Sequence, residues 1–236
     1  PGKAYARWGG FLDGIQDFDP LFFGITPRDA AVLDPQVRLF LEESWRAFED
    51  AGLTRDALRG QRVGVFAAAM YGMYELLQTE NDGVDVPVSS SLSAIANRVS
   101  YFMNFTGPSL TVDSMCSSSL SALHLGCQSI RQGESDIVLV GGVNLTVHPN
   151  KLVLLSQGRF AARDGRCRAF GADGSGYVPG EGVGALVLKP LGRAIADGDP
   201  VRAVIRASVV NSGGHTSGFT VPNPVAQAAL VREGLD

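Results

Sequence analysis

The fold prediction starts from residues 109–120, which read Ser109-Leu-Thr-Val-Asp-Ser-Met-Cys-Ser-Ser-Ser-Leu120. Leu110 and Val112 alternate with a polar residue, a pattern typical of a strand. Ser117–Ser119 are residues of the type that caps the first N–H groups of a helix. The helix that would follow has one apolar face, formed by Leu120, Leu123, Cys127 and Ile130. Cys116 is therefore predicted to lie at a strand-to-helix turn.

A cysteine in that position has two interpretations. The positive end of a helix dipole favours thiolate over thiol, which predicts that Cys116 is a nucleophile. The alternative is a buried cysteine that only packs, which is what most cysteines do. Cys127 lies on the apolar helix face, and Cys167 lies in a loop between two arginines. The spacing of the 3 cysteines matches no metal motif and their odd number argues against a disulfide framework, so we expect a cytoplasmic protein.

Composition limits the possible classes of partner. A chain of 236 residues with 45% hydrophobic and 19% charged residues has enough apolar material for one substantial core. No apolar run is long enough to cross a membrane and no signal peptide is visible, while a net charge of −4 provides no basic surface for nucleic acid. We therefore expect neither a membrane nor nucleic acid as a partner. With no repeat and no linker, residues 1–236 are interpreted as a single, partial domain.

Hydrophobic periodicity predicts alternating helices and strands in the first two thirds of the chain. An amphipathic helix is predicted over 29–52, with Asp34-Pro35 as a start signal and Gly52 as a stop. Further helices are predicted over 71–78, 89–103 and 149–156, and buried strands over 62–69 and 136–143. This alternation predicts a layered α/β architecture.

The glycine-rich region 158–182 carries a possible site at Glu181. Its sequence matches neither the phosphate-binding loop motif nor the serine-hydrolase motif. A carboxylate between glycines often accepts hydrogen bonds from backbone N–H groups. A structural role for Glu181 is therefore predicted. The remaining elements are a strand over 183–188, a helix and turn closing at 195–199, a long strand over 201–211, and a helix over 224–235 with no evident cap. From these ends we expect the natural protein to extend beyond both Pro1 and Asp236.

Several separated motifs together resemble the β-ketoacyl synthase family. Val112-Asp-Ser-Met-Cys-Ser-Ser-Ser-Leu120 resembles the active-site signature of that family. The other motifs are Phe18-Asp-Pro-Leu-Phe-Phe-Gly-Ile-Thr-Pro-Arg28, Leu33-Asp-Pro-Gln36, Glu49-Asp-Ala-Gly52, Asn97-Arg-Val-Ser-Tyr101, Gly141-Gly-Val-Asn144 and Tyr177-Val-Pro-Gly-Glu-Gly-Val-Gly184. They cover nearly the whole chain in the right order. Within the family, the chain resembles the ketosynthase domain of a bacterial modular polyketide synthase. Val147-His-Pro-Asn-Lys151, Leu155-Ser-Gln157, Gly165-Arg-Cys-Arg168 and Thr220-Val-Pro-Asn-Pro-Val-Ala-Gln227 resemble the branch whose acyltransferase acts in trans.

The resemblance implies a thiolase-like fold with layers α-β-α-β-α, incomplete in this chain, and a homodimer with the strand Leu110–Asp113 near its twofold axis. It implies that Cys116 accepts an acyl chain from the phosphopantetheine arm of an acyl carrier protein. A malonyl unit on a second carrier protein would then lose carbon dioxide and attack the thioester. Partners would be acyl carrier proteins and flanking polyketide synthase domains, with no cofactor bound directly. Fatty acid synthesis uses the same reaction.

The family's two catalytic histidines and supporting lysine lie beyond the end of this chain. None of His124, His148 and His215 matches them, so we expect no condensation by this segment alone. The alternative function is a non-elongating, transfer-only or structural ketosynthase-like domain. The sequence around Cys116 disfavours a thiolase or a starter synthase. Met115 and Phe160 are candidate substrate contacts, with core packing as the other interpretation of each.

Overall fold

The computed structural model describes residues 3–77 and 90–236. One mixed sheet runs through it, with strands β1 (Val63–Ala68), β2 (Ser109–Val112), β3 (Ile137–Asn144) and β4 (Gly182–Leu188). Their order is β2-β1-β3-β4; β1 is parallel to β2 and β3, and β4 is antiparallel to β3. Because β1, β2 and β3 are parallel, their carboxyl ends lie at one edge of the sheet, and the segments that follow them meet there.

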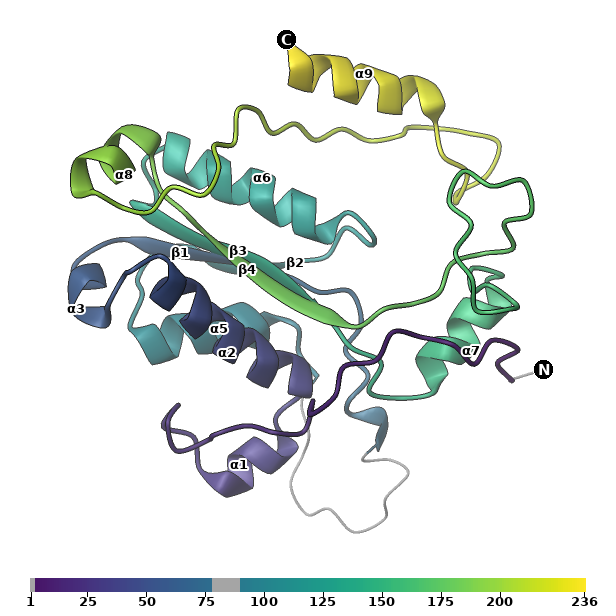
Figure 1. The fold of residues 1–236 in the computed structure, drawn as a ribbon, viewed down its shortest axis with the longest axis horizontal. Helices are drawn as coiled ribbons and strands as arrows, with labels where there is room; N and C mark the ends of the chain where they lie inside the picture. Colours follow the sequence, from purple (N-terminus) through teal and green to yellow (C-terminus); the bar gives the residue numbers. More distant parts are fainter. Residues whose placement is uncertain (1–2, 78–89) are drawn as a thin grey trace.

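Helices cover both faces of this sheet. The described helices are α1 (Pro27–Val32), α2 (Pro35–Asp50), α3 (Arg55–Leu58), α5 (Ser93–Met103), α6 (Ser118–Arg131), α7 (Asn150–Gln157), α8 (Leu191–Asp197) and α9 (Pro224–Leu235). Figure 1 shows α2 and α5 on one face and α6 on the other, which gives three α/β/α layers and confirms the predicted fold class. Within the described ranges, no helix combines the length and apolar character that crossing a membrane requires.

Strand β1 shows why the sheet needs both helix layers. All its residues are buried, and they alternate between two cores. Val63, Val65 and Ala67 join the core beneath α2 and α5, whereas Phe66 and Ala68 join the core beneath α6. A strand covered on both faces reads as a continuous apolar run, as predicted for 62–69 and 136–143.

The start signal at Asp34-Pro35 is confirmed, but the predicted extent of the helix from Asp29 is wrong. Residues 27–32 form the separate helix α1, and α2 begins at Pro35. Proline lacks an N–H group and disfavours helical backbone in the residue before it, which breaks the two helices apart. The Asp34 side chain accepts the Gln36 N–H at 2.8 Å and caps α2.

Three further expectations need correction. In the predicted helix 71–78, residues 71–73 have no regular structure, helix begins at Leu76, and Gln78 lies outside the described residues.

The predicted strand 201–211 is extended and largely exposed, and the described residues contain no strand paired with it. Alternation predicts which side chains share a face, but it does not provide the neighbouring strand that a ladder needs. Helix α9 is also capped after all, because Asn223 Oδ1 accepts N–H groups of its first turn.

The other predicted elements lie close to their expected positions. They are α5, which ends at Asn104 in left-handed backbone, together with α6, α7, α8, β1, β2, β3 and β4. In Figure 1 the extended segment after α8 runs past α6 toward α9. Its contacts with the body include a hydrogen bond of 3.0 Å between the Ser208 carbonyl and His124 Nδ1 on α6.

Candidate active site

A tight turn joins β2 to α6 and carries Cys116. Asp113 follows β2, and its Oδ1 accepts the N–H of Met115 at 2.9 Å. Met115 has left-handed backbone with φ of 58°, a conformation that costs a non-glycine residue roughly 1 kcal/mol or more. The turn leaves the Cys116 thiol exposed. The structure therefore confirms that Cys116 lies between a strand and a helix and excludes a buried packing role for it.

The serines beside Cys116 stabilise the turn instead of capping the helix. Ser118 Oγ accepts the Ser114 N–H at 2.9 Å and donates to the Met115 carbonyl at 2.6 Å. Ser117 Oγ donates to the Ser114 carbonyl at 2.8 Å, and Ser117 makes no side-chain hydrogen bond to α6. The predicted capping role is therefore wrong for Ser117, because the carbonyl of the turn is its nearer partner. The hydroxyl groups of Ser117 and Ser118 therefore hold the backbone of the residues that precede Cys116.

Cys116 lines a cavity of about 260 Å³ at the carboxyl edge of the sheet. The wall opposite the turn is formed by the segments that follow β1 and β3, by helix α7, and by the loop before β4. The lining residues are Ala68, Ala69, Met70, Tyr71, Met115, Cys116, Ser118, Ser119, Val143, Asn144, Lys151, Leu155, Tyr177, Pro179 and Gly180. The cavity thus combines an exposed thiol with one buried cation and two phenols.

Lys151 is the cation in this cavity, and its side chain is almost fully buried at 4% exposure. Its Nζ donates to Asn144 Oδ1 at 2.6 Å and to the Leu145 carbonyl at 2.7 Å. Burial lowers the pKa of Lys151 from 10.5 to about 8, and the nearby charge of Glu181 acts in the opposite direction. The ammonium form is therefore the main form at neutral pH, but it is less stable there than in water.

Glu181 fixes the loop beside the cavity. Its Oε1 accepts the Thr146 N–H at 2.6 Å and its Oε2 accepts the Leu12 N–H at 2.8 Å. Its own N–H donates to the Gly10 carbonyl at 2.7 Å. These contacts confirm the predicted structural role for Glu181, which ties the amino-terminal arm to the chain after β3.

Tyr177 lies in the same cavity wall as Lys151. Burial first, and then negative charge at Cys116 and Tyr71, raises the pKa of Tyr177 above its ordinary value. Tyr177 is held through its backbone, since its N–H donates to the Phe160 carbonyl and its carbonyl accepts the Ala162 N–H, both at 2.8 Å. The phenol of Tyr177 is therefore protonated and neutral at neutral pH.

The structure places the two candidate substrate contacts differently. Met115 is 60% exposed and lines the cavity beside Cys116. Phe160 is 48% exposed and is not among the residues that line this cavity. The Phe160 backbone, however, pairs with Tyr177, which does line it. Substrate contact stays a prediction for both residues.

The histidines lie apart from the cavity lining. His124 is on α6 and contacts the Ser208 carbonyl, and His148 Nδ1 accepts the Asn150 N–H at 3.1 Å just before α7. His215 is exposed in the loop before α9. Among the described residues, no group of three or more His, Cys, Asp or Glu side chains is arranged to hold a metal ion. The described cavity therefore offers a nucleophile without an adjacent imidazole.

Sequence reasoning did not select three residues of the cavity, namely Asn144, Lys151 and Tyr177. They lie on separate segments, and no periodicity connects them. A signal was present, because each belongs to one of the short motifs quoted for the family resemblance. Motifs of that kind, far apart in sequence, are expected to meet at a shared site.

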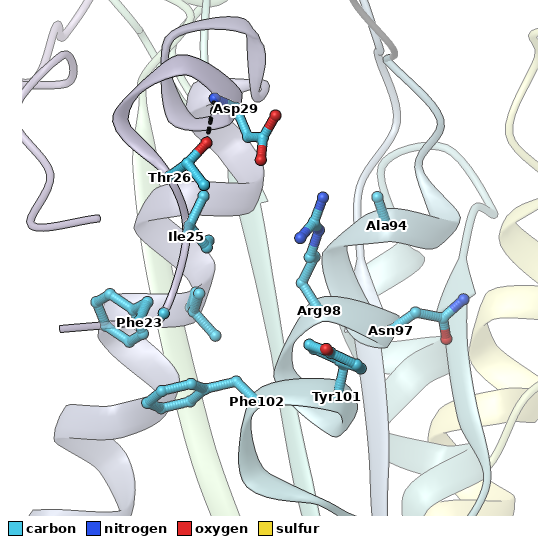
Figure 2. A pocket seen from close by; sticks show the side chains of 11 residues that line it. Phe23, Ile25, Thr26, Asp29, Ala94, Asn97, Arg98, Tyr101 and Phe102 are labelled. Carbon is cyan, nitrogen blue, oxygen red and sulfur yellow. Dashed lines mark hydrogen bonds between the residues drawn. The ribbon is translucent and has the colours of Figure 1, made fainter. Parts of the chain in front are cut away.

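A second and larger pocket lies elsewhere. Figure 2 shows Arg98 and Tyr101 of α5 on one side of it, with Thr26 and Asp29 at the start of α1 on the other. Its volume is about 490 Å³, and Thr26 Oγ1 accepts the Asp29 N–H at 3.1 Å within its wall. None of the described residues that line it is a cysteine or a histidine. Volume alone therefore does not identify the site of chemistry in this protein.

The chain belongs to the β-ketoacyl synthase family, because residues 1–194 match the model of the beta-ketoacyl synthase N-terminal domain. Its relatives include polyketide synthase ThaG of Burkholderia thailandensis, 54% identical over 99% of this chain and 4% of that protein. Polyketide synthase PksL of Bacillus subtilis is 48% identical over 100% of this chain and 5% of that protein. The chain thus spans a small part of these relatives.

Solved structures agree with this assignment. The oxazolomycin ketosynthase domain OzmH KS7 of Streptomyces albus JA3453 superposes with a TM-score of 0.96 at 51% identity, covering 100% of this chain and 41% of that chain. A ketosynthase from module 6 of the bacillaene synthase of Bacillus subtilis 168 gives 0.88 at 40% identity, covering 94% of this chain and 38% of that chain. The thiolase-like fold expected from the motifs is therefore shown, with this chain matching less than half of each ketosynthase.

Proposed function

We propose that Cys116 is the acyl acceptor of a polyketide ketosynthase. The observation that carries this proposal is the exposed thiol on a strained strand-to-helix turn, facing a cavity lined by Lys151 and Tyr177. The family membership and the polyketide synthase relatives support it. Covalent catalysis of this kind divides a difficult carbon–carbon bond formation into two easier steps.

In the first step, the Cys116 thiolate attacks the carbonyl carbon of an acyl thioester on phosphopantetheine. A new carbon–sulfur bond forms at Cys116, the bond to the pantetheine sulfur breaks, and that sulfur leaves as a thiolate and takes up a proton. The oxyanion formed in between needs hydrogen-bond donors, and the backbone N–H of Cys116 is our candidate for one of them. No cofactor takes part in this step.

In the second step, a malonyl unit on another carrier protein loses carbon dioxide. The electron pair of the broken carbon–carbon bond forms the new bond to the acyl carbon, and the Cys116 sulfur leaves as a thiolate. We assign this step to the whole protein, since no described histidine lines the cavity. The alternative is a non-elongating, transfer-only domain that loads acyl chains and passes them on.

The partners we propose are acyl carrier proteins, the flanking domains of a polyketide synthase and a second copy of this chain. Strand β2 is at the edge of the sheet, and Leu110 on it is 51% exposed. An apolar edge strand of this kind is expected to be covered, which supports a homodimer with β2 near its axis. The Val147–Lys151 motif supports the branch that receives extender units in trans, and we expect a cytoplasmic location.

The experiment separates loading from condensation. The protein is incubated with an acyl thioester of pantetheine, and the released pantetheine thiol and the protein mass are measured. We expect one thiol released per acyl group bound, with no release by Cys116→Ser. Cys127→Ser is the matched control and should load normally, because Cys127 is a buried packing residue at 9% exposure.

A malonyl carrier protein is then added to the loaded protein. In the whole protein, a 3-oxoacyl product indicates elongation, whereas loading without this product indicates a transfer-only domain. Release of a condensed product by residues 1–236 alone would contradict our expectation that this segment does not suffice. Loading of Cys116→Ser at the normal rate would overturn the proposed function itself.

A further inference from the structure

Lys151 has hydrogen-bonding capacity that the protein does not use. An ammonium group carries three N–H donors, and Nζ directs two of them to Asn144 Oδ1 and the Leu145 carbonyl. For the third, the described residues provide no hydrogen-bond acceptor, and the centroid of the Tyr71 ring lies 5.3 Å from Nζ. A buried donor without an acceptor is costly, so it marks a place where an incoming oxygen is stabilised.

This ammonium group is held firmly in place. The Leu145 peptide accepts from Lys151 on one side, and its N–H donates to Gln36 Oε1 at 3.4 Å on the other. Asn144 Nδ2 in turn donates to the Gly180 carbonyl at 2.5 Å. Lys151 therefore cannot move toward a new partner without breaking contacts to the end of β3 and the loop before β4. A fixed donor imposes geometry on whatever binds to it.

The charge of Lys151 has no direct counter-ion within the described part of the chain. Glu181 is the acid that acts on it electrostatically, but both Glu181 oxygens already accept backbone N–H groups. The other ionisable groups lining the cavity are Cys116, Tyr71 and Tyr177, which are neutral in their protonated forms. Burial lowers the pKa of Lys151 to about 8, as expected for a cation that still lacks a partner.

We propose that Lys151 is a specificity-determining residue that donates its third N–H to an oxygen substituent on the acyl chain bound at Cys116. The substrates it favours are acyl chains with a hydroxyl or carbonyl oxygen close to the thioester, rather than saturated alkyl chains. This inference rests on the proposed function. A site built around a buried donor discriminates against an analogue that lacks the acceptor, because the donor then stays unpaired.

The experiment compares two thioesters that differ in a single oxygen, 3-hydroxybutyryl- and butyryl-N-acetylcysteamine. The rate of acylation of Cys116 is followed by mass spectrometry at limiting thioester concentration. We expect the wild-type protein to prefer the hydroxylated chain by about tenfold or more. Lys151→Met should acylate with the two thioesters at similar rates and so lose the preference, whereas Lys151→Arg should retain part of it.

Lys3→Met is the control, since Lys3 is an exposed lysine outside the cavity, and its preference should match the wild type. Equal wild-type rates with the two thioesters overturn the inference while the proposed function stands, and this comparison does not depend on how any variant folds. A preference that persists in Lys151→Met also overturns it. Failure of both thioesters to acylate wild-type Cys116 overturns the proposed function instead.

Discussion

The three cysteine thiols of this protein lie in three different environments. Cys127 is buried on α6, and the Cys167 sulfur is exposed but accepts the Val178 N–H at 3.0 Å. Cys116 is exposed and lines a cavity. A thiolate reacts only where a thioester can reach it, so exposure toward a cavity distinguishes Cys116 more clearly than its sequence position does.

Ser118 is predicted to stabilise the turn that presents Cys116. Replacing Ser118 with alanine leaves the Ser114 N–H and the Met115 carbonyl without their side-chain partner at a position that is 5% exposed. We expect a loss of about 1–3 kcal/mol in the free energy of unfolding, measured by urea denaturation. Ser117→Ala is the matched control, because the exposed Ser117 makes its bond in water-accessible surroundings. Equal losses for the two variants would contradict this assignment.

The lowered pKa of Lys151 predicts a pH dependence of stability. Below pH 8 Lys151 is an ammonium in both the folded and the unfolded protein, so the unfavourable free energy of burying this charge lowers stability in full. Between pH 8 and the ordinary value of 10.5, the unfolded chain holds a proton that the folded protein has lost, so stability rises with pH by linkage. The expected gain relative to Lys151→Met is at most about 3 kcal/mol. It is measured as the difference between wild-type and Lys151→Met unfolding free energies, and a constant difference across this range would contradict the prediction.

At the scale of elements, Gly141 lies on β3 where the neighbouring strand β4 and helix α2 leave no room for a side chain. A Cβ there would meet the Gly184 carbonyl oxygen and would lie 2.9 Å from both Ala185 Cα and the Phe40 ring. These neighbours are backbone and a fully buried ring, and neither moves easily. The glycine is therefore required by the packing of the sheet against α2.

Gly141→Ala is predicted to lower the free energy of unfolding by about 1–3 kcal/mol through overpacking. Thermal or chemical denaturation measures this. Gly184→Ala is the control within the same strand pair, because a Cβ at Gly184 meets nothing within 4 Å, and it should leave stability nearly unchanged. The packing argument fails if both variants are equally stable.

Elements could be predicted from the sequence wherever local chemistry alone determines them. The Asp34-Pro35 start of α2 and the end of α5 at Asn104 are local signals, and the structure confirms both. The segment 201–211 has a strand-like alternation, yet it lacks a paired neighbour among the described residues. A helix satisfies its own backbone, whereas a strand depends on another segment, and this is why the strand prediction failed.

At the scale of the whole molecule, the position of Cys116 could be predicted from the sequence, but the residues that line the rest of its cavity could not. Cys116 followed from a continuous strand-turn-helix pattern. Asn144, Lys151 and Tyr177 are brought to it because the parallel strands β1, β2 and β3 end, and the antiparallel strand β4 begins, at one edge of the sheet, a tertiary arrangement that no single segment encodes. Only the family resemblance, through its separated motifs, connected these segments in advance.

The same arrangement makes the central claim testable in one sample. The protein is incubated with a limiting amount of an acyl-pantetheine thioester, digested, and mapped so that the acyl group is located among Cys116, Cys127 and Cys167. Cys167 is an internal control, because it is also exposed but lies outside the cavity. We predict that the acyl group is found on Cys116 almost exclusively; acylation of Cys167 to an equal or greater extent would contradict the account.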